Sequence, residues 1–266
     1  MSGRFIDGYD RVPATLAAHV TDVRLGHVVR EIMWEPGRVE VRYSTSASSG
    51  SVAARSAIVT VPLGVLQQTE GEGAIAFTPD VTETRRAAAQ LAMGAVVRMV
   101  LLFSEPFWES KSVRRRTGGR SIAELAFLHS SDDDVPIWWT AAPIRGRTIV
   151  GWTGGVKAQR LAKRGPEEIE GRAVAALARQ VGIQRRRLAA LVEQCWHHDW
   201  IGDPYTRGAY SYAVVGGSTA AKRLARPVGD TLYFAGEAAD VEGRTGTVHG
   251  AMGTGYRAAA SILRGD

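Results

Sequence analysis

The chain has 266 residues, of which 45% are hydrophobic and 23% charged, so it can bury a sizeable core and has no apolar run long enough to span a membrane. Its single cysteine, Cys195, excludes an internal disulfide framework and a multi-cysteine metal site. The formal net charge is +6. The arginines, including the runs at 114–116 and 185–187, show no spacing typical of a nucleic-acid-binding motif. We therefore expect a cytoplasmic protein with no nucleic-acid partner and no membrane partner.

The first part of the chain favours strands. Residues 11–20 predict a short helix. The segments "RVEVRY" and "VAARSAIVTVPLGVL" alternate apolar and polar residues, and "STSASSG" between them supplies a turn, which predicts a β-meander. After Pro79, "DVTETRRAAAQLA" predicts a polar helix and "VVRMVLLF" a strand.

The second part alternates strands and helices. "PIWWTA" and "TIVGWTGG" predict two strands that are apolar enough to be buried on both faces. Helices are predicted around residues 167–180 and 185–191. In "CWHHDWIGDPYTRGAYSYAVVGG" strand patterns and turn residues mix. His197 and His198 would point to opposite faces of a strand with no second ligand pair nearby, so we expect no metal site.

The chain closes on a strand, a glycine-rich bend and a helix. The strand "TLYFA" runs into Gly236, and the helix begins near Thr247, so its free N–H groups suit an anionic ligand beyond the strand. Small residues inside a helix are costly unless a backbone or a flat ligand packs on them. A helix packed on its own sheet explains Gly253 and Gly255, whereas the run of Gly243, Gly246 and Gly250 at the N-terminal end favours a ligand. No stretch supplies a G-x-G-x-x-G dinucleotide fingerprint after a predicted strand.

The segment "YFAGEAADVEGRTGTVHGAMGTGYRAA" resembles the C-terminal signature of the flavin-dependent amine oxidases, the family of monoamine oxidases, polyamine oxidases and flavin-type histone lysine demethylases. Four further blocks agree in order: "GYDRVPATLA", "AIVTVPLGVL", "MGAVVRMVLLFSEPFW" and "WIGDPYTRGAYSY". The five blocks span nearly the whole chain. The family's N-terminal G-x-G-x-x-G unit has no counterpart, so we expect the chain to correspond to the later part of the family only.

The resemblance implies an α+β fold related to α/β proteins. It places a partial FAD-binding domain in residues 1–63 and 226–266, and a substrate-binding domain with a mixed sheet flanked by helices in residues 64–225. The implied activity is FAD-dependent oxidation of a C–N bond of a small-molecule amine to an imine, by hydride transfer to the flavin. The alternative is a catalytically silent fragment or subunit that needs a separate N-terminal half to bind FAD. Sheet surface left uncovered would also favour a homo-oligomer.

Cofactor-binding residues carried over from the resemblance come from both chain ends. The backbone around Val248 would face flavin O2, Glu237 would lie near the pyrophosphate, and Val29 would contact adenine through its backbone. Ala209 stands where cysteinyl-flavin members have cysteine, so any FAD is noncovalent, and whether this chain binds FAD alone stays open. The full set is Val29, Pro62, Trp200, Gly236, Glu237, Thr247, Val248 and Ala251.

Three residues match catalytic positions of the family. Tyr210 matches the cage aromatic that lies against the flavin, and Thr247 stands where some members carry a second cage tyrosine. Arg98 replaces the lysine that holds a water against flavin N5, and arginine stays protonated where a lysine can shift its pKa. Two plainer readings stay open. Arg98 is also compatible with a strand residue whose charge reaches solvent or a buried acid, and Trp200 and Tyr210 with packing beside a turn.

Overall fold

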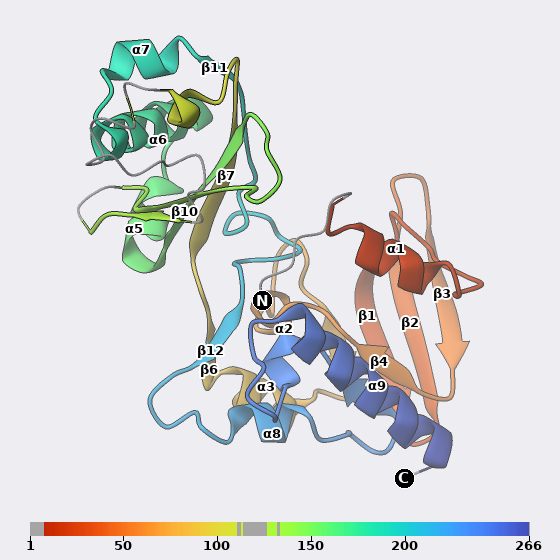
Figure 1. Cartoon of the computed structure of the whole chain (residues 1–266). Helices are drawn as coiled ribbons and strands as arrows, with labels where there is room; N and C mark the ends of the chain where they lie inside the picture. Colours follow the sequence, from red (N-terminus) through yellow and green to blue (C-terminus); the bar gives the residue numbers. More distant parts are fainter. Residues whose placement is uncertain (1–7, 111–112, 114–126, 132–133, 266) are drawn as a thin grey trace.

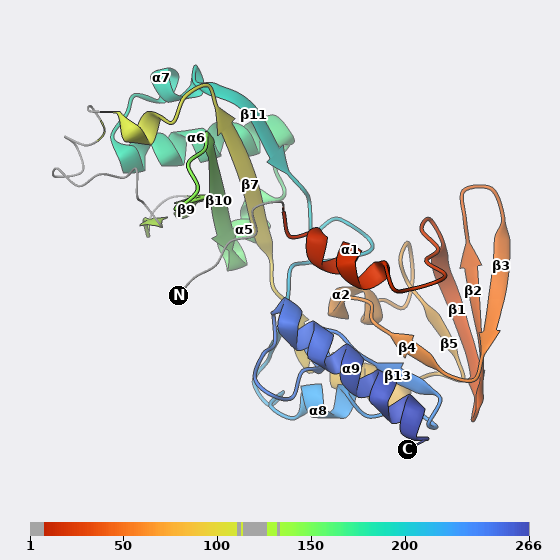
Figure 2. The same cartoon turned by 45° about the vertical axis from the view of Figure 1, so that its right-hand side comes forward.

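The computed structural model describes residues 8–110, 113, 127–131 and 134–265. The arginine run at 114–116 lies outside the described residues. In Figures 1 and 2 the described elements form two lobes, and both ends of the chain contribute to the same one. We call this the terminal lobe, and the other the central lobe.

The largest sheet of the terminal lobe has the order β3-β2-β1-β5. β1, β2 and β3 are antiparallel neighbours, which confirms a β-meander, whereas β5 is parallel to β1. Pro36 and Gly37 make the turn between β1 and β2, and Gly37 takes a φ of +79° that suits glycine. The strand bounds are Val28–Glu35 for β1, Arg38–Ser44 for β2, Ser49–Ala54 for β3 and Ala76–Thr78 for β5.

A second, two-stranded sheet pairs segments from far apart in the sequence. β4 (Ala57–Val59) and β13 (Leu232–Phe234) are parallel, so both strands end at the same edge. The helix α9 (Val248–Arg264) lies beside them (Figure 2) and closes with Gly265 in the left-handed conformation. The strand and helix predicted at the end of the chain are therefore confirmed.

Short elements connect the two lobes, and here the sequence expectations were less accurate. The strand predicted over 52–66 is divided into β3, which ends at Ala54, and β4, which ends at Val59 and belongs to another sheet. Pro62, which cannot donate to a ladder, then precedes the helix α2. The helix predicted over 80–92 is the shorter α3, and Gln67 holds its end by donating to Ala88 and Leu91 carbonyls. The bounds are Leu63–Leu66 for α2, Thr82–Ala88 for α3, Leu91–Met93 for β6, Ser211–Ala213 for β12 and Ala220–Leu224 for α8.

The central lobe holds a sheet of order β11-β7-β10-β9-β8, whose strand pairings are all antiparallel. The α+β class is confirmed. The mixed sheet, with both parallel and antiparallel strands, was predicted for the substrate side but lies in the terminal lobe. β9 and β10 alternate buried and half-buried residues, so the expectation of burial on both faces was wrong. The bounds are Val96–Phe103 for β7, Leu128–His129 for β8, Ile137–Thr140 for β9, Thr148–Gly154 for β10 and Val192–His197 for β11.

Helices cover one face of this sheet (Figure 1). α6 begins with Pro166 in its first turn and ends at Gly182, which is left-handed with φ +67°. This matches the helix predicted around 167–180, and α7 matches the one predicted at 185–191. The bounds are Gly155–Leu161 for α5, Pro166–Val181 for α6 and Arg185–Ala189 for α7.

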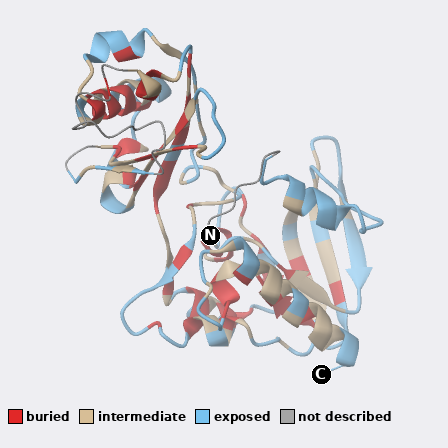
Figure 3. Ribbon diagram, viewed as in Figure 1, coloured by how far each residue is buried: buried red, intermediate tan, exposed pale blue. Residues whose placement is uncertain are grey.

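Buried apolar residues gather in a separate cluster in each lobe (Figure 3). The central cluster lies between Ala95 and Leu188. The terminal cluster joins β1, β4 and β13 to residues of α2, α3 and α8. Packing thus groups residues 64–91 and 220–225 with the terminal lobe, although the sequence assigned them to the substrate side. The domain boundaries at 63 and 226 stay a prediction.

The helix α1 (Arg11–Ala17) has no buried residue and stops three residues before the predicted end at 20. No described helix has the length and apolarity needed to cross a membrane. The described residues contain no group of three or more histidine, cysteine and acidic side chains placed to hold a metal ion.

Candidate functional site

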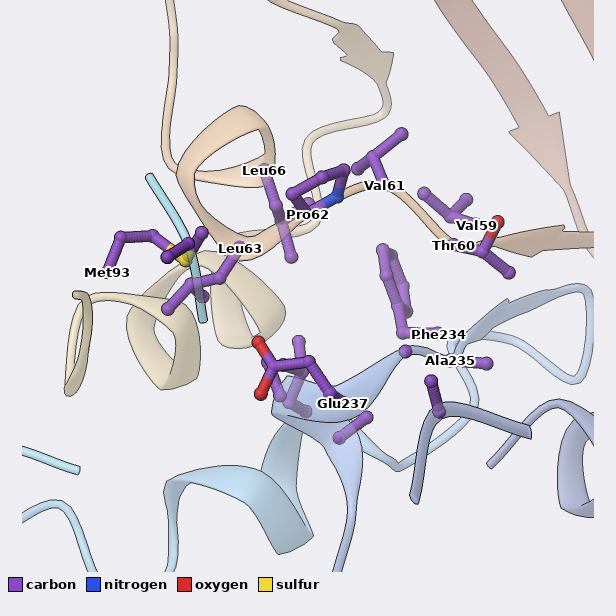
Figure 4. A pocket seen from close by; sticks show the side chains of 16 residues that line it. Val59, Thr60, Val61, Pro62, Leu63, Leu66, Met93, Phe234, Ala235 and Glu237 are labelled. Carbon is purple, nitrogen blue, oxygen red and sulfur yellow. The ribbon is translucent and has the colours of Figure 1, made fainter. Parts of the chain in front are cut away.

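A pocket of about 220 Å³ lies where β4 and β13 end. Ligands of parallel sheets bind beyond the carboxyl ends of the strands, because chain turns there expose backbone groups. Residues 60–62 after β4 form one wall, and residues 235–237 after β13 form the opposite wall. Figure 4 shows Pro62 and Glu237 on opposite sides of the pocket. Met93, Ala209, Leu224 and Ala251 of α9 also line it, so six separate segments of the chain meet here.

Small residues keep one side of the pocket shallow. Gly236 has a φ of +126°, which side-chain-bearing residues rarely adopt. Both of its peptide groups are held by Thr254 of α9, whose hydroxyl oxygen accepts from Gly236 N at 2.8 Å and lies 3.1 Å from Gly236 O. The end of β13 is thereby fixed to the helix. The small lining residues are Ala209, Ala235, Gly236, Ala238, Ala239 and Ala251.

The N-terminus of α9 is capped from within the chain. The Thr247 hydroxyl accepts from Gly250 N at 3.1 Å and donates to the carbonyl of Arg244. Gly250 has to be glycine, because a Cβ there would lie 2.4 Å from the Arg244 carbonyl oxygen. The N–H groups of Val248 and His249 precede the first intrahelical bonds and have no acceptor within the helix. The positive end of the helix dipole therefore opens beside the pocket.

The Glu237 carboxylate accepts three hydrogen bonds from two segments. Its donors are the N–H of Ser211 at 2.9 Å, the hydroxyl of Ser211 at 2.9 Å and the N–H of Gly246 at 2.8 Å. The carboxylate thus lies at the border of the pocket and is bound to backbone on both sides.

Tyr210 lies beside a second cavity of about 500 Å³. Its carbonyl accepts from Gly94 N at 2.7 Å, and a Cβ on Gly246 would stand 3.6 Å from its ring. Tyr210 is 41% exposed. Trp152 and Tyr212 also line this cavity, and Met93 lines both cavities. The chain at 209–210 therefore separates the pocket from the second cavity.

The remaining sequence-predicted residues lie outside the pocket. Arg98 is exposed on β7 and pairs across the sheet with Trp152, so its charge reaches solvent. Trp200 is 39% exposed, with its ring centroid 4.4 Å from that of His198. Val29 packs at the margin of the terminal cluster on β1. Thr247 and Val248 stand at the start of α9 without lining the pocket wall.

A buried carboxylate, which the sequence analysis overlooked, holds the loop in front of α9. Asp240 is 3% exposed, accepts from the N–H groups of Glu242 and Arg244 and pairs with the Arg244 guanidinium at 3.1 Å. Burial alone would raise the pKa of Asp240, but hydrogen bonds from these groups outweigh it and hold the pKa below its usual value. The sequence did offer a signal for this contact, because Asp240 stands four residues before Arg244 in a glycine-rich loop.

Comparison with known proteins gives a consistent result. Residues 2–263 match the family described as flavin containing amine oxidoreductase. The chain is 31% identical over 261 residues to polyamine oxidase 3 of Oryza sativa subsp. japonica, covering 97% of this chain and 48% of that protein. It is 30% identical over 218 residues to lysine-specific histone demethylase 1 homolog 1 of the same organism, covering 78% of this chain and 23% of that one.

The solved structures with a similar fold include two proteins named as oxidases of amines. Wild-type putrescine oxidase bound to putrescine aligns with a TM-score of 0.77 at 23% identity, over 97% of this chain and 53% of that one. Cyclohexylamine oxidase from Brevibacterium oxydans aligns with a TM-score of 0.68 at 23% identity, over 89% of this chain and 48% of that one. The chain thus spans about half the length of the polyamine oxidases that it matches.

Proposed function

The chain belongs to the family of flavin containing amine oxidoreductases, and from this premise we propose that it forms the flavin-ring and substrate side of a site that oxidises a C–N bond of a small-molecule amine to an imine. The observation that carries the proposal is the pocket at the ends of β4 and β13, where Pro62, Gly236, Glu237 and Ala251 converge. The family match supports a flavin, and we propose FAD.

The pocket residues fit one flat ring system. Alanine and glycine line one side of it, and the positive end of α9 opens beside it, which suits a ring that gains negative charge on reduction. Its volume of about 220 Å³ is below the 300–1,000 Å³ typical of sites for whole drug-sized ligands. Because Ala209 has no thiol, the bound group would be noncovalent.

The protein's own residues would bind and orient the amine. When bound, the flavin would supply the chemistry by accepting a hydride equivalent from the carbon next to the amine nitrogen. Tyr210 would place its ring beside the amine at the border of the two cavities. Thr247 and Val248 would present the helix end, and Thr247 is too short to face Tyr210 as a second aromatic wall. Arg98 would keep a permanent positive charge on the exposed face of β7.

The proposal assigns the outer parts of the cofactor to three residues. Glu237 would lie toward the pyrophosphate, Val29 would contact adenine through its backbone, and Trp200 would flank the ring. Val29 lies on β1, away from the pocket, so these contacts extend over the surface of the terminal lobe.

A second candidate is a silent fragment or subunit that needs a separate N-terminal half to bind FAD. The observation that favours it is the extent of the match, since the chain covers 48% of polyamine oxidase 3. The small volume of the pocket agrees with it. Pairing of two copies through uncovered sheet surface is the homo-oligomeric version of the same proposal.

The two candidates are separated by adding FAD to the purified chain, alone and together with a protein that corresponds to the N-terminal half of a polyamine oxidase. We expect flavin absorption to remain after dialysis, and an amine to bleach it, when both halves are present. Retention by the chain alone would contradict the need for a partner. No retention in either sample would contradict the proposed function.

A glycine pair provides the control for the pocket. Gly236→Val should abolish flavin retention, because it fills the pocket wall and forces valine into a φ of +126°. Gly71→Val should leave retention unchanged, since Gly71 also has a positive φ, +83°, but has open space around its Cβ and does not line the pocket.

A further inference from the structure

We propose that Glu237 is a positioning residue that sets the distance between Tyr210 and the start of α9. The inference rests on the proposed function, because Tyr210 and Thr247 matter as a pair only if an amine is oxidised between them and a flavin. The proposal gives Glu237 a role that needs no cofactor contact, and it can be tested in the absence of flavin.

The geometry of the carboxylate carries the inference. Oε1 accepts from the N–H of Ser211 at 2.9 Å, and Oε2 accepts from the Ser211 hydroxyl at 2.9 Å and the N–H of Gly246 at 2.8 Å. Ser211 directly follows Tyr210, and Gly246 directly precedes Thr247. One side chain therefore joins the two segments that carry the aromatic and the helix cap.

Within the part of the chain that the structure describes, the other hydrogen bonds of the Tyr210 segment do not reach the start of α9, so the carboxylate of Glu237 is what joins the two segments. The segment of Tyr210 is tied to β6 by Gly94, which accepts from Ala209 N at 2.9 Å and donates to the Tyr210 carbonyl at 2.7 Å. The Tyr210 ring lies against Gly246, whose φ of +75° suits glycine. Among the described residues, no other hydrogen bond joins 209–211 to 246–247, so the approach of the helix end to Tyr210 depends on Glu237.

The alternative role for Glu237 is direct contact with the cofactor, which would require free acceptor positions on its carboxylate. An ionised carboxylate has about four acceptor positions, and three are used here by partners from its own chain. Its charge would also repel a pyrophosphate at close range. Hydrogen bonds to an ionised acceptor are about twice as strong as neutral ones, so all three contribute to holding the two segments together. The contacts therefore favour positioning over direct binding of a phosphate.

Glu237→Gln tests the proposal with little change in size. The amide nitrogen of glutamine donates, so it cannot accept from Gly246 or from Ser211 at the oxygen that it replaces. We expect hydrogen-exchange protection, followed by NMR on the full chain without flavin, to fall roughly 10-fold or more at the N–H of Ser211 or of Gly246, whichever faces the amide nitrogen. Protection at Leu101 in the centre of β7 should stay unchanged.

Glu242→Gln is the matched control, because it makes the same replacement in the same loop at an acid whose side chain is 66% exposed. It should leave both amides protected. If Glu237→Gln does not fold, Ser211→Ala removes a single donor and should still lower protection at Gly246 several-fold through the shared carboxylate. Unchanged protection at both Ser211 and Gly246 in the folded variants, or an equal loss at Leu101, would overturn the proposal.

A kinetic readout separates positioning from cofactor binding. In flavin-loaded protein, Glu237→Gln should lower kcat, expressed per bound flavin, at least 10-fold. Loss of flavin with exchange protection intact would overturn the positioning role. If protection falls as expected but the chain binds no flavin with either half present, the proposed function fails and the link between the two segments stands.

Discussion

The two lobes differ in how far their helices are buried. α6 of the central lobe and α9 of the terminal lobe have nearly equal lengths, 16 and 17 residues, but α6 buries seven residues and α9 three. α1 buries none, and Leu16, Val20 and Leu25 near it are exposed. Figure 3 shows this contrast in the helices, since α6 is largely red whereas α9 and α1 are mostly tan and pale blue. A sheet has to bury at least one face against another layer, and the central lobe meets that condition with its helices packed on one face of an antiparallel sheet.

The contrast indicates where each lobe obtains its stability. The central lobe relies on close packing around β7, whose Met99, Leu101 and Phe103 are fully buried. The terminal lobe also has a buried cluster, and hydrogen bonds to Asp240, Glu237 and Thr254 fix the loops at the edge of its pocket. The following predictions test this difference, from the largest expected effect to the smallest.

Trp138→Ala should cost the most. The side chain is fully buried, donates to the Val135 carbonyl at 3.0 Å and fits a space that only Gly151 leaves open, since a Cβ there would lie 2.6 Å from its ring. We expect the free energy of unfolding to fall by about 3–5 kcal/mol, measured in urea. Trp196→Ala on β11, 50% exposed, is the control and should cost about 1 kcal/mol or less. Equal costs would contradict the packed core.

Asp240→Asn should cost about 1.5–3 kcal/mol, because it weakens charged hydrogen bonds to a buried group. The pKa of Asp240 is lowered in the folded chain. Its stabilisation is therefore present above the ordinary aspartate pKa of about 3.9 and is lost as the pH falls through the lower folded value.

The measurement is the free energy of unfolding from neutral pH down to about pH 3, close to that ordinary pKa. The asparagine variant should start lower and lose less on acidification than the unmodified chain. Asp10→Asn on the exposed end of α1 is the control and should follow the unmodified chain. A variant that loses as much as the unmodified chain would show that Asp240 does not carry this pH dependence.

Thr254→Val should cost about 1–2 kcal/mol, because the Gly236 N–H loses its acceptor at a position where Thr254 is 1% exposed. If the chain retains flavin together with an N-terminal-half protein, Thr254→Val should also lower that retention. Thr15→Val on exposed α1 is the control, and thermal unfolding of both variants provides the comparison. If both lose the same amount, the hydroxyl of Thr254 is not what ties β13 to α9.

Leu16→Ser should change the free energy of unfolding of the chain alone by about 0.5 kcal/mol or less, since no residue of α1 is buried. The same variant should weaken capture of an N-terminal-half protein, measured by titration of the two halves. A large loss in the chain alone would mean that α1 is already packed, and the contrast between the lobes would disappear.

Several elements were predictable because their signals are local. The alternation in "VVRMVLLF" gives the bounds of β7 correctly, and Pro166 and Gly182 delimit α6. The short elements α2, β5, β6, α5 and α8 were missed or misassigned. Each has seven residues or fewer, and its form is set by a partner strand or by a cap such as Gln67, which periodicity over so few residues does not reveal.

For the candidate site too, the sequence predicted some features and missed others. The blocks of sequence identified the family and pointed to Pro62, Gly236, Glu237 and Ala251, which do line one pocket. The bonds of Glu237 to Ser211 and Gly246, and of Thr254 to Gly236, were not foreseen, because they join residues distant in sequence.

The sequence by itself determined the family, the central strand, the long helices and the closing strand and helix, since these depend on periodicity, glycine and proline within a few neighbouring residues. The tertiary structure alone decided which side chains meet. The parallel pairing of β4 with β13 brings residue 62 beside residues 236 and 237, and α9 then brings residue 251 to the same edge. Such convergence follows from long-range pairing, which no local pattern encodes.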